Sequence, residues 1–219
     1  MKTIATEERE DKTYDLDYLL DQFSVSLRNH SRRVAVCSAI IAEHANASKN
    51  YYDVPIGMSL PVIVYTGGTC HDIGKLMLPT LEAKDGDYKK HPIWGAELLK
   101  KHNVTLFGNK HSVQMVLDIV SYHHERADGA GFPKGLKAGD IPLIAGICSI
   151  ANKLDHDMYW GNKRGNDEVG VYKTLEAQAG KHFCECIWDC VERAWSRLVE
   201  RYAYWNNFAC NHDGAEPNT

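Results

Sequence analysis

Two pairs of adjacent residues carry side chains that divalent metal ions prefer. His71-Asp72 and His123-His124 each stand at the expected end of a helix and next to a glycine-rich segment. Imidazole nitrogens and carboxylate oxygens are ligands of first-row divalent ions, and one aspartate can bridge two metals through its two oxygens. We therefore expect a metal centre with Asp72 as the bridge. A lone histidine is more often a surface or hydrogen-bonded core residue, so the hypothesis depends on the longer pattern.

The longer pattern covers about residues 25 to 205. Its segments are His30 with Arg32-Arg33, His71-Asp72-Ile73-Gly74-Lys75, Pro79, His91-Pro92 with Gly95, His123-His124-Glu125, Asp128-Gly129, Gly131-Phe132-Pro133, Ile141-Pro142 and Ala151-Asn152-Lys153-Leu154-Asp155. In order and spacing, these segments resemble the HD-GYP subfamily of the HD-domain metal-dependent phosphohydrolases. The resemblance implies an all-α, single-domain helical bundle that encloses two or three metals, usually iron or manganese, with cyclic di-GMP as the usual substrate.

Carried over position by position, the resemblance nominates six metal ligands and places Lys75 against the substrate phosphate. The ligands are His30, His71, Asp72, His91, His123 and His124. Six groups supply about three protein ligands to each of two metals, which leaves room for a bridging hydroxide as nucleophile and for a phosphate oxygen. Asp72 and Lys75 are thus the expected catalytic residues. The residue types do not fix the metal, since nickel, zinc or magnesium could replace iron or manganese.

The chain departs from the family pattern at the last ligand, where Asn152 stands in place of an aspartate. An amide oxygen can coordinate a metal but brings no negative charge, so we expect weaker metal binding there. Asp155 is either a substitute ligand or the family's own second acidic residue, and we prefer the second interpretation because ligand geometry tolerates little displacement. Ser26 stands where three-metal members carry a glutamate, so we expect two metals.

A second departure lies after this helix, where the family usually shows an arginine-rich stretch that binds phosphate. Lys163 and Arg164 are the expected replacements, and Tyr159 or Trp160 could stack on a guanine base. Packing is the alternative role for either ring.

The segment from Arg126 to Gly139 is expected to be a long glycine-rich loop near the metal site. Its length and its position directly after two expected ligands favour contact with substrate or a partner over a plain connector. Phe132 stands where the family name has tyrosine, which keeps the ring but removes the hydroxyl.

Helices must position these residues, and apolar residues recur at helical spacing along most of the chain. Leu16 to Phe23 and Val34 to Ala45 predict two early helices. Further helices are expected at about 58–71, at 92–102 with Pro92 in the first turn, at 112–123 with Ser112 as a cap, from about Pro142, at 171–178, and from 183 to about 205. No alternating pattern typical of strands competes with them.

The composition limits the number of domains and the kinds of partner that we expect. With 219 residues, of which 44% are hydrophobic, we expect one domain at 15–206 between flexible ends at 1–14 and 207–219. A net charge of -4 argues against DNA as a partner, and no apolar stretch is long enough to span a membrane. The 7 cysteines favour reduced thiols in the cytoplasm, and the spacing of Cys184, Cys186 and Cys190 predicts buried thiols rather than a zinc site.

The function expected from these features is hydrolysis of cyclic di-GMP to linear pGpG, to GMP or to both. One alternative is an HD phosphohydrolase for another cyclic dinucleotide or nucleotide. The other is a degenerate module that binds a nucleotide or a partner protein without turnover, and Asn152 is its main support. A regulatory protein acting in trans is a further expectation, while the oligomeric state is not fixed by the sequence.

Overall fold

The computed structural model describes residues 14–45, 59–78, 85–102, 110–160 and 167–211, without the side chains of residues 85, 160 and 208–211. The elements in these ranges are α1 (Leu16–Asp21), α2 (Val25–Ala42), α3 (Leu60–Cys70), the 3-10 helix η2 (Ile73–Met77), α4 (Asp85–Tyr88), α5 (His91–Lys101), α6 (Lys110–Tyr122), α7 (Leu143–Asp155), the π-helical segment η3 (His156–Trp160), α8 (Glu168–Glu176) and α9 (Glu185–Asn211). Apart from two isolated bridges, the described ranges contain no β-structure, which confirms the all-α prediction.

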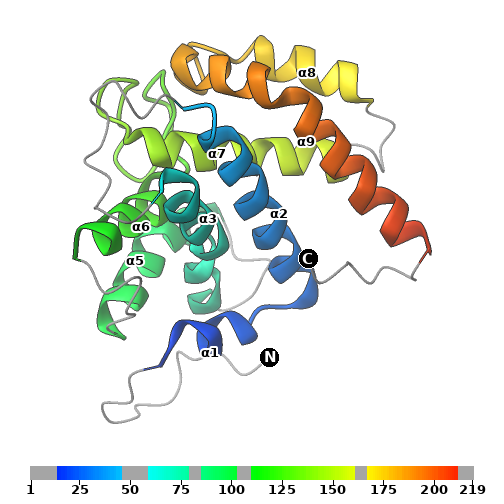
Figure 1. Cartoon of the computed structure of the whole chain (residues 1–219). Helices are drawn as coiled ribbons and strands as arrows, with labels where there is room; N and C mark the ends of the chain where they lie inside the picture. The colour runs from blue at the N-terminus through cyan, green and yellow to red at the C-terminus, as the bar shows by residue number, and fades with distance from the viewer. Residues whose placement is uncertain (1–13, 46–58, 79–84, 103–109, 161–166, 212–219) are drawn as a thin grey trace.

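Helix α2 is the centre of the bundle and packs against α3, α7 and α9 (Figure 1). On the other side, α6 contacts α3, α5 and α7, while η2 lies against the start of α5. The core between these helices is formed by fully buried aliphatic side chains such as Val34, Ile63, Ile119 and Ile147. None of the described helices combines the length and the apolar character needed to cross a membrane.

Local signals explain where several helices begin. The side chain of Asp15 accepts a hydrogen bond from the Tyr18 N–H at the start of α1, and Ser24 does the same for the Leu27 N–H at the start of α2. Such caps satisfy N–H groups that have no partner within the helix. Pro92 occupies the first turn of α5, as predicted.

Two predicted boundaries were wrong. Ser112 does not cap a helix, because α6 already begins at Lys110 and Ser112 is buried within it. The last helix continues to Asn211 rather than ending near Trp205.

The helices that carry the first two expected ligands meet at a glycine. A Cβ atom on Gly68 of α3 would lie 2.7 Å from the Cα atom of Ala35 in α2, a distance that side-chain-bearing residues do not reach. The missing side chain therefore allows the two backbones to approach closely. This approach brings the α2 face that carries His30 next to the end of α3, where His71 lies.

Candidate metal centre

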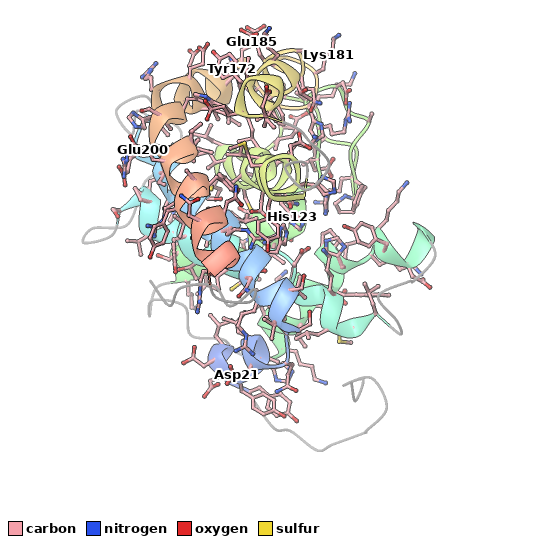
Figure 2. All side chains as sticks on the ribbon, turned by 90° about the vertical axis from the view of Figure 1, so that its right-hand side faces the viewer. Asp21, His123, Tyr172, Lys181, Glu185 and Glu200 are labelled. Carbon is pink, nitrogen blue, oxygen red and sulfur yellow. The ribbon has the colours of Figure 1, made fainter. Side chains whose placement is uncertain are left out.

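Six residues that the sequence nominated as ligands lie together where helices begin, end or cross. His30 comes from α2, His71 and Asp72 follow α3, His91 opens α5, and His123 and His124 follow α6. Together they form two groups of metal-binding atoms, and within each group these atoms lie within 4.8 Å of one another. Figure 2 shows His123 in the interior of the bundle, far from labelled surface residues such as Glu185. The ligand assignment itself stays a prediction, and the geometry brings these six residues together.

Asp72 belongs to both groups and presents one oxygen to each. Its Oδ1 atom lies 3.2 Å from Nε2 of His91 and 3.9 Å from Nε2 of His123. Its Oδ2 atom lies 3.3 Å from Nε2 of His71 and 3.6 Å from Nε2 of His30. We call Asp72 with His91, His123 and His124 the Oδ1 group, and Asp72 with His30 and His71 the Oδ2 group. One carboxylate thus stands between two clusters of imidazoles.

Backbone carbonyl groups fix the orientation of three of these imidazoles. The Nδ1–H groups of His71, His91 and His123 donate to the carbonyl oxygens of Gly68 at 2.7 Å, Tyr88 at 2.6 Å and Val120 at 2.9 Å, respectively. Because a carbonyl oxygen only accepts hydrogen bonds, each Nδ1 atom must carry the proton. In the neutral ring the Nε2 lone pair is then left facing Asp72, which is the arrangement of a metal-binding histidine.

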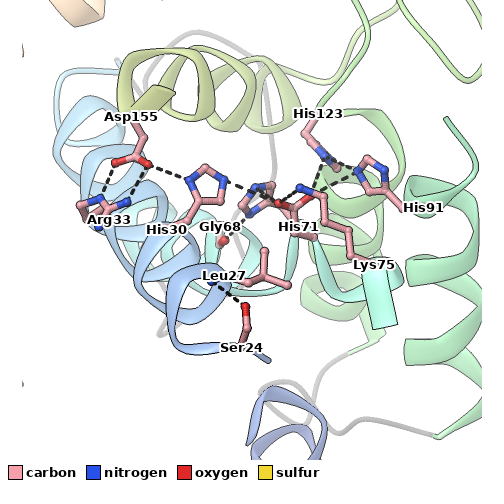
Figure 3. Close-up of polar contacts among 11 residues, drawn as sticks. Ser24, Leu27, His30, Arg33, Gly68, His71, Lys75, His91, His123 and Asp155 are labelled. Carbon is pink, nitrogen blue, oxygen red and sulfur yellow. Dashed lines mark hydrogen bonds and ion pairs between the residues drawn. The ribbon is translucent and has the colours of Figure 1, made fainter. Parts of the chain in front are cut away.

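His30 is oriented differently, by the side chain of Asp155. Its Nδ1–H donates to Asp155 Oδ2 at 2.7 Å (Figure 3). Arg33 donates to both oxygens of this carboxylate, from Nε at 2.6 Å and from Nη2 at 3.1 Å. The Tyr202 hydroxyl donates to Oδ1 at 3.0 Å. Because both oxygens of Asp155 are engaged, we do not expect this residue to replace Asn152 as a metal ligand.

The charge state of Asp155 follows from these contacts. Burial alone would raise its pKa, but the hydrogen bond from His30 and the Arg33 guanidinium outweigh burial and lower it. Asp155 is therefore an ionised carboxylate that accepts the Nδ1 proton of His30.

The unpaired atoms of the cluster fit bound divalent cations. Nε2 of His71, Oδ1 of Asp72 and Nε2 of His124 are buried and have no hydrogen-bond partner. Nε2 of His91 lies only 3.3 Å from Nε2 of His123, although both Nδ1 atoms carry the ring proton. Facing lone pairs repel each other unless a proton or a cation lies between them, and buried polar atoms without partners are rare in folded proteins. A divalent ion within each group would satisfy them.

The protonation states suit the same interpretation. Burial lowers the pKa of His71, and lowers the pKa of His123 and His124 well below the usual value, so these rings are neutral at pH 7. Burial would raise the pKa of Asp72, but its interactions with His71 and with the positive charge of Lys75 outweigh burial, and the pKa lies well below its usual range. Neutral imidazoles and an ionised carboxylate are the forms that bind metals.

Lys75 lies beside the bridge. Its Nζ donates to Asp72 Oδ2 at 2.6 Å. Burial would lower its pKa, yet the Asp72 carboxylate outweighs burial and raises it, so the side chain is a cation. Close packing of η2 on α5 holds it there, since a Cβ atom on Gly74 would lie 1.9 Å from the carbonyl oxygen of His91. A fixed positive charge therefore borders the centre at the Oδ2 side.

The glycine-rich loop is anchored directly after His124. The buried carboxylate of Glu125 accepts hydrogen bonds from the N–H groups of Lys134 at 2.6 Å and Leu136 at 2.8 Å. The ring of Phe132 stacks on His124, with the ring centroids 4.6 Å apart. The loop therefore reaches the Oδ1 group through Phe132, and the ring at this position contacts a proposed ligand.

The structure describes only some of the remaining predicted site residues. Asn152 is half-buried on α7, one turn before Asp155. Trp160 ends η3 and its side chain is not described, while Lys163 and Arg164 lie outside the described residues. The Arg33 guanidinium covers one face of the Tyr159 ring at 3.7 Å. Tyr159 thus takes part in packing around Arg33.

Sequence reasoning missed the support of His30. The family pattern includes Arg33 without a role for it, and the apolar periodicity predicts Tyr202 only as part of a closing helix. The one available signal was an arginine three residues after an expected ligand and directly before the apolar stripe that begins at Val34, because a buried arginine requires an anionic partner. This signal does not identify the partner, Asp155, which lies 122 residues away in the sequence.

Comparison with known proteins finds similarity to one protein family and to several phosphodiesterases. A model of the HD domain family matches residues 27–157. The chain is 26% identical over 200 residues to 3'3'-cGAMP-specific phosphodiesterase 2 of Vibrio cholerae serotype O1, which covers 85% of this chain and 35% of that protein. It is 24% identical over 208 residues to a cyclic di-GMP phosphodiesterase of Thermotoga maritima, with 91% of this chain and 53% of that protein covered.

A third similarity is to the cyclic di-GMP phosphodiesterase response regulator RpfG of Xanthomonas campestris, 30% identical over 132 residues, or 56% of this chain and 31% of that protein. The chain spans from 31% to 53% of the length of these three relatives. The family match covers more than half of the chain and includes all six clustered ligand positions. The resemblance seen in the sequence is thereby confirmed, and the chain belongs to the HD domain family.

Proposed function

We propose that this chain is a metal-dependent phosphodiesterase that hydrolyses cyclic dinucleotides, with cyclic di-GMP as the first substrate to test and pGpG, GMP or both as products. Cyclic di-GMP and 3'3'-cGAMP are named as substrates of the relatives described above. The observation that carries the proposal is the position of Asp72, whose two oxygens face two separate groups of histidines. Few arrangements other than a pair of cations account for so many buried lone pairs around one carboxylate.

The proposed metal ligands are the six clustered residues, with Asn152 as a neutral seventh. Iron(II) and manganese(II) are the first ions to test, with nickel, zinc or magnesium as alternatives. When bound, such cations supply Lewis-acid activation of water and neutralise charge on the phosphate. Asp72 holds the two sites at a fixed separation, and the backbone-bound imidazoles keep their Nε2 atoms directed at it.

The other residues of the proposed reaction bind and orient the substrate. Lys75 supplies a positive charge at the edge of the centre, where it can exchange its contact with Asp72 for a non-bridging phosphate oxygen. Lys163, Arg164 and Trp160 are proposed to contact the nucleotide, as the sequence predicted. Phe132 covers one face of His124 and thereby limits access of water to the Oδ1 group.

A second candidate substrate is 3'3'-cGAMP, because one of the relatives with high coverage of this chain is named as specific for it. Both substrates contain the same phosphodiester linkage, so the metal centre cannot distinguish them. The two substrates differ in their bases, and the residues proposed to contact the bases are Trp160 and residues that follow it in the sequence. Turnover of the two substrates in parallel decides between them.

In the test, protein loaded with Mn(II) or Fe(II) is incubated anaerobically with each cyclic dinucleotide, and the nucleotide products are separated. The Asp72→Ala variant is the matched control. We expect product from the wild type and a loss of at least about 10³-fold in the variant, because several kcal/mol of charge stabilisation disappear with the shared ligand. If both proteins are folded and metal-loaded wild type forms no product from either substrate, the proposed function is wrong and a non-catalytic binding role takes its place.

A further inference from the structure

A cavity of about 460 Å³ lies between the end of the glycine-rich loop and the start of α9, and none of the six clustered ligands lines it. Apolar residues form most of its wall, among them Ile141, Leu143, Phe183 and Ile187. Two cysteines, Cys184 and Cys186, also line it. Glu185, between them in the sequence, lies at the periphery of the molecule (Figure 2). Both cysteines are only half-buried, so a small molecule in the cavity can reach their thiols.

The two sulfur atoms are close neighbours. Sγ of Cys184 lies 2.6 Å from Sγ of Cys186, and both side chains are half-buried. A disulfide bond has a sulfur–sulfur distance of about 2.05 Å, so a small side-chain movement suffices to form one. The remaining cysteines whose burial is described, Cys37, Cys70, Cys148 and Cys190, are buried.

The position of the pair gives its two thiols different roles. Cys184 directly precedes α9, and its carbonyl oxygen accepts the N–H groups of Ile187 and Trp188 in the first turn. A thiolate at a helix N-terminus is stabilised by the free N–H groups and by the helix dipole. Burial and the adjacent Cys184 sulfur raise the pKa of Cys186 to about 12. The raised pKa of Cys186 leaves Cys184 as the attacking thiol, and Cys186 keeps its proton while Cys184 reacts.

We propose that Cys184 and Cys186 are a thiol–disulfide exchange site for small-molecule disulfides. The Cys184 thiolate attacks one sulfur of the small disulfide, which forms a mixed disulfide and releases one small thiolate. Cys186 then loses its proton and attacks the Cys184 sulfur, which forms the protein disulfide and releases the second small thiolate. Two protein thiols are oxidised, two electrons pass to the small disulfide, and the two protons end on the two small thiols.

The other described cysteines are poorly suited to this reaction. Burial raises the pKa of Cys37 and of Cys70 to about 12 and raises that of Cys148 further, so little thiolate forms at pH 7. Cys190 donates to the backbone carbonyl oxygens of Cys186 and His44. It is thus turned toward the protein rather than toward the cavity, and it is a natural control.

The exchange site is joined to the glycine-rich loop by backbone hydrogen bonds. The Ala127 N–H donates to the carbonyl oxygen of His182 at 3.1 Å, and the Asp128 N–H donates to that of Lys181 at 2.8 Å. Ala127 lies three residues after His124. A disulfide in the adjoining segment is therefore only a few residues from the loop that adjoins the Oδ1 group. The proposal about the thiols does not depend on phosphodiesterase activity.

The experiment treats the folded, reduced full chain with oxidised glutathione, blocks the remaining thiols by alkylation, and digests with a protease that cleaves after glutamate. Cleavage after Glu185 separates Cys184 from Cys186, so the two peptides stay together only if a disulfide joins them. We expect a linked pair in the wild type and in Cys190→Ser, separable by a reductant. Cys186→Ser is expected to accumulate a glutathione adduct on Cys184, and Cys184→Ser to form no linked pair.

The proposal is overturned if both cysteines of the folded wild type remain alkylatable at glutathione concentrations that oxidise a model dithiol. It is also overturned if each carries its own glutathione, or if Cys186→Ser shows no adduct on Cys184. Serine differs from cysteine by one atom, and far-UV circular dichroism of each variant establishes that the fold is retained.

Discussion

The two histidine groups around Asp72 are held in different ways. In the Oδ1 group, His91 and His123 are oriented by backbone carbonyl oxygens at helix ends. In the Oδ2 group, His71 is held in the same way by the Gly68 carbonyl oxygen. His30 instead depends on the carboxylate of Asp155, which itself depends on Arg33 and Tyr202. The first arrangement follows from helix geometry, whereas the second requires side chains from α2, α7 and α9 to meet. Single substitutions should therefore affect the Oδ2 group far more selectively than the Oδ1 group.

Asn152, the residue that departs from the family's ligand pattern, lies near the network that orients His30. Asn152 lies on α7, one turn from the residue that orients His30. If Asn152 is a ligand, its metal site has one negative charge fewer than the family pattern provides. That metal site is the one beside the network of Arg33 and Asp155. Arg33 balances the charge of the Asp155 carboxylate in that network, so the network does not replace the missing negative charge.

The largest effect on stability is expected for Arg33→Leu. Arg33 is fully buried, and its removal leaves the Asp155 carboxylate without its cationic partner. Breaking a buried ion pair by removing one partner typically costs about 3–5 kcal/mol. Urea denaturation measures this loss. Arg197→Leu is the matched control, because its ion pair with Glu43 is exposed and should contribute less than about 1 kcal/mol. Similar losses in the two variants would contradict the structural role of Arg33.

Lys75→Ala tests the charge next to the shared oxygen. The substitution leaves all six clustered ligands in place, so metal content should not fall. Turnover should fall by about 10²–10³-fold, the range seen when one electrostatic contact to a transition state is removed. Steady-state kinetics with parallel metal analysis measures both quantities. A variant that loses metal together with activity would show that Lys75 supports the centre rather than the substrate.

Asp155→Asn tests the selective dependence of the Oδ2 group. The amide cannot supply the negative charge that holds the Nδ1 proton of His30, and loss of such a supporting carboxylate typically costs about 10–100-fold in metal affinity. Titration with a competing chelator should show one weakened metal and one unchanged. Asp118→Asn on α6 is the control, since Asp118 contacts Gln114 and none of the ligands. Equal weakening of both metals by Asp155→Asn would remove the distinction between the groups.

Asn152→Asp should have the smallest effect. If residue 152 is a ligand, the restored carboxylate should tighten one metal, by about tenfold or less, because charge adds to a site that already has its other ligands. The same chelator titration measures the change. Unchanged affinities for both metals would place residue 152 outside the coordination sphere.

The sequence predicted the helical bundle because most helices carry an apolar stripe of their own, as Val113 to Val120 does for α6. It did not predict α4, η2 or η3, which are too short to show a period. The six clustered residues followed from a long motif whose members stand next to helix ends and turns. The domain boundaries and the roles of Lys163 and Arg164 stay predictions.

The network of Arg33, Asp155 and Tyr202 could not be predicted for a different reason. Each residue type is common on helices, and the pairs are separated by 47 and 122 residues. Periodicity specifies which face of a helix is buried but not which side chain meets it from another helix. Glu125 is a similar case, because its two backbone partners became visible only with the path of the loop.

The most direct test of the shared carboxylate is the number of metal ions bound per chain after anaerobic loading with Mn(II) or Fe(II), removal of free metal, and elemental analysis. The structure predicts two ions for the wild type, one for His30→Ala, one for His91→Ala and none for Asp72→Ala, with every variant folded by circular dichroism. Retention of one ion by Asp72→Ala, or loss of both ions in His30→Ala, would contradict a single carboxylate shared between two cation sites.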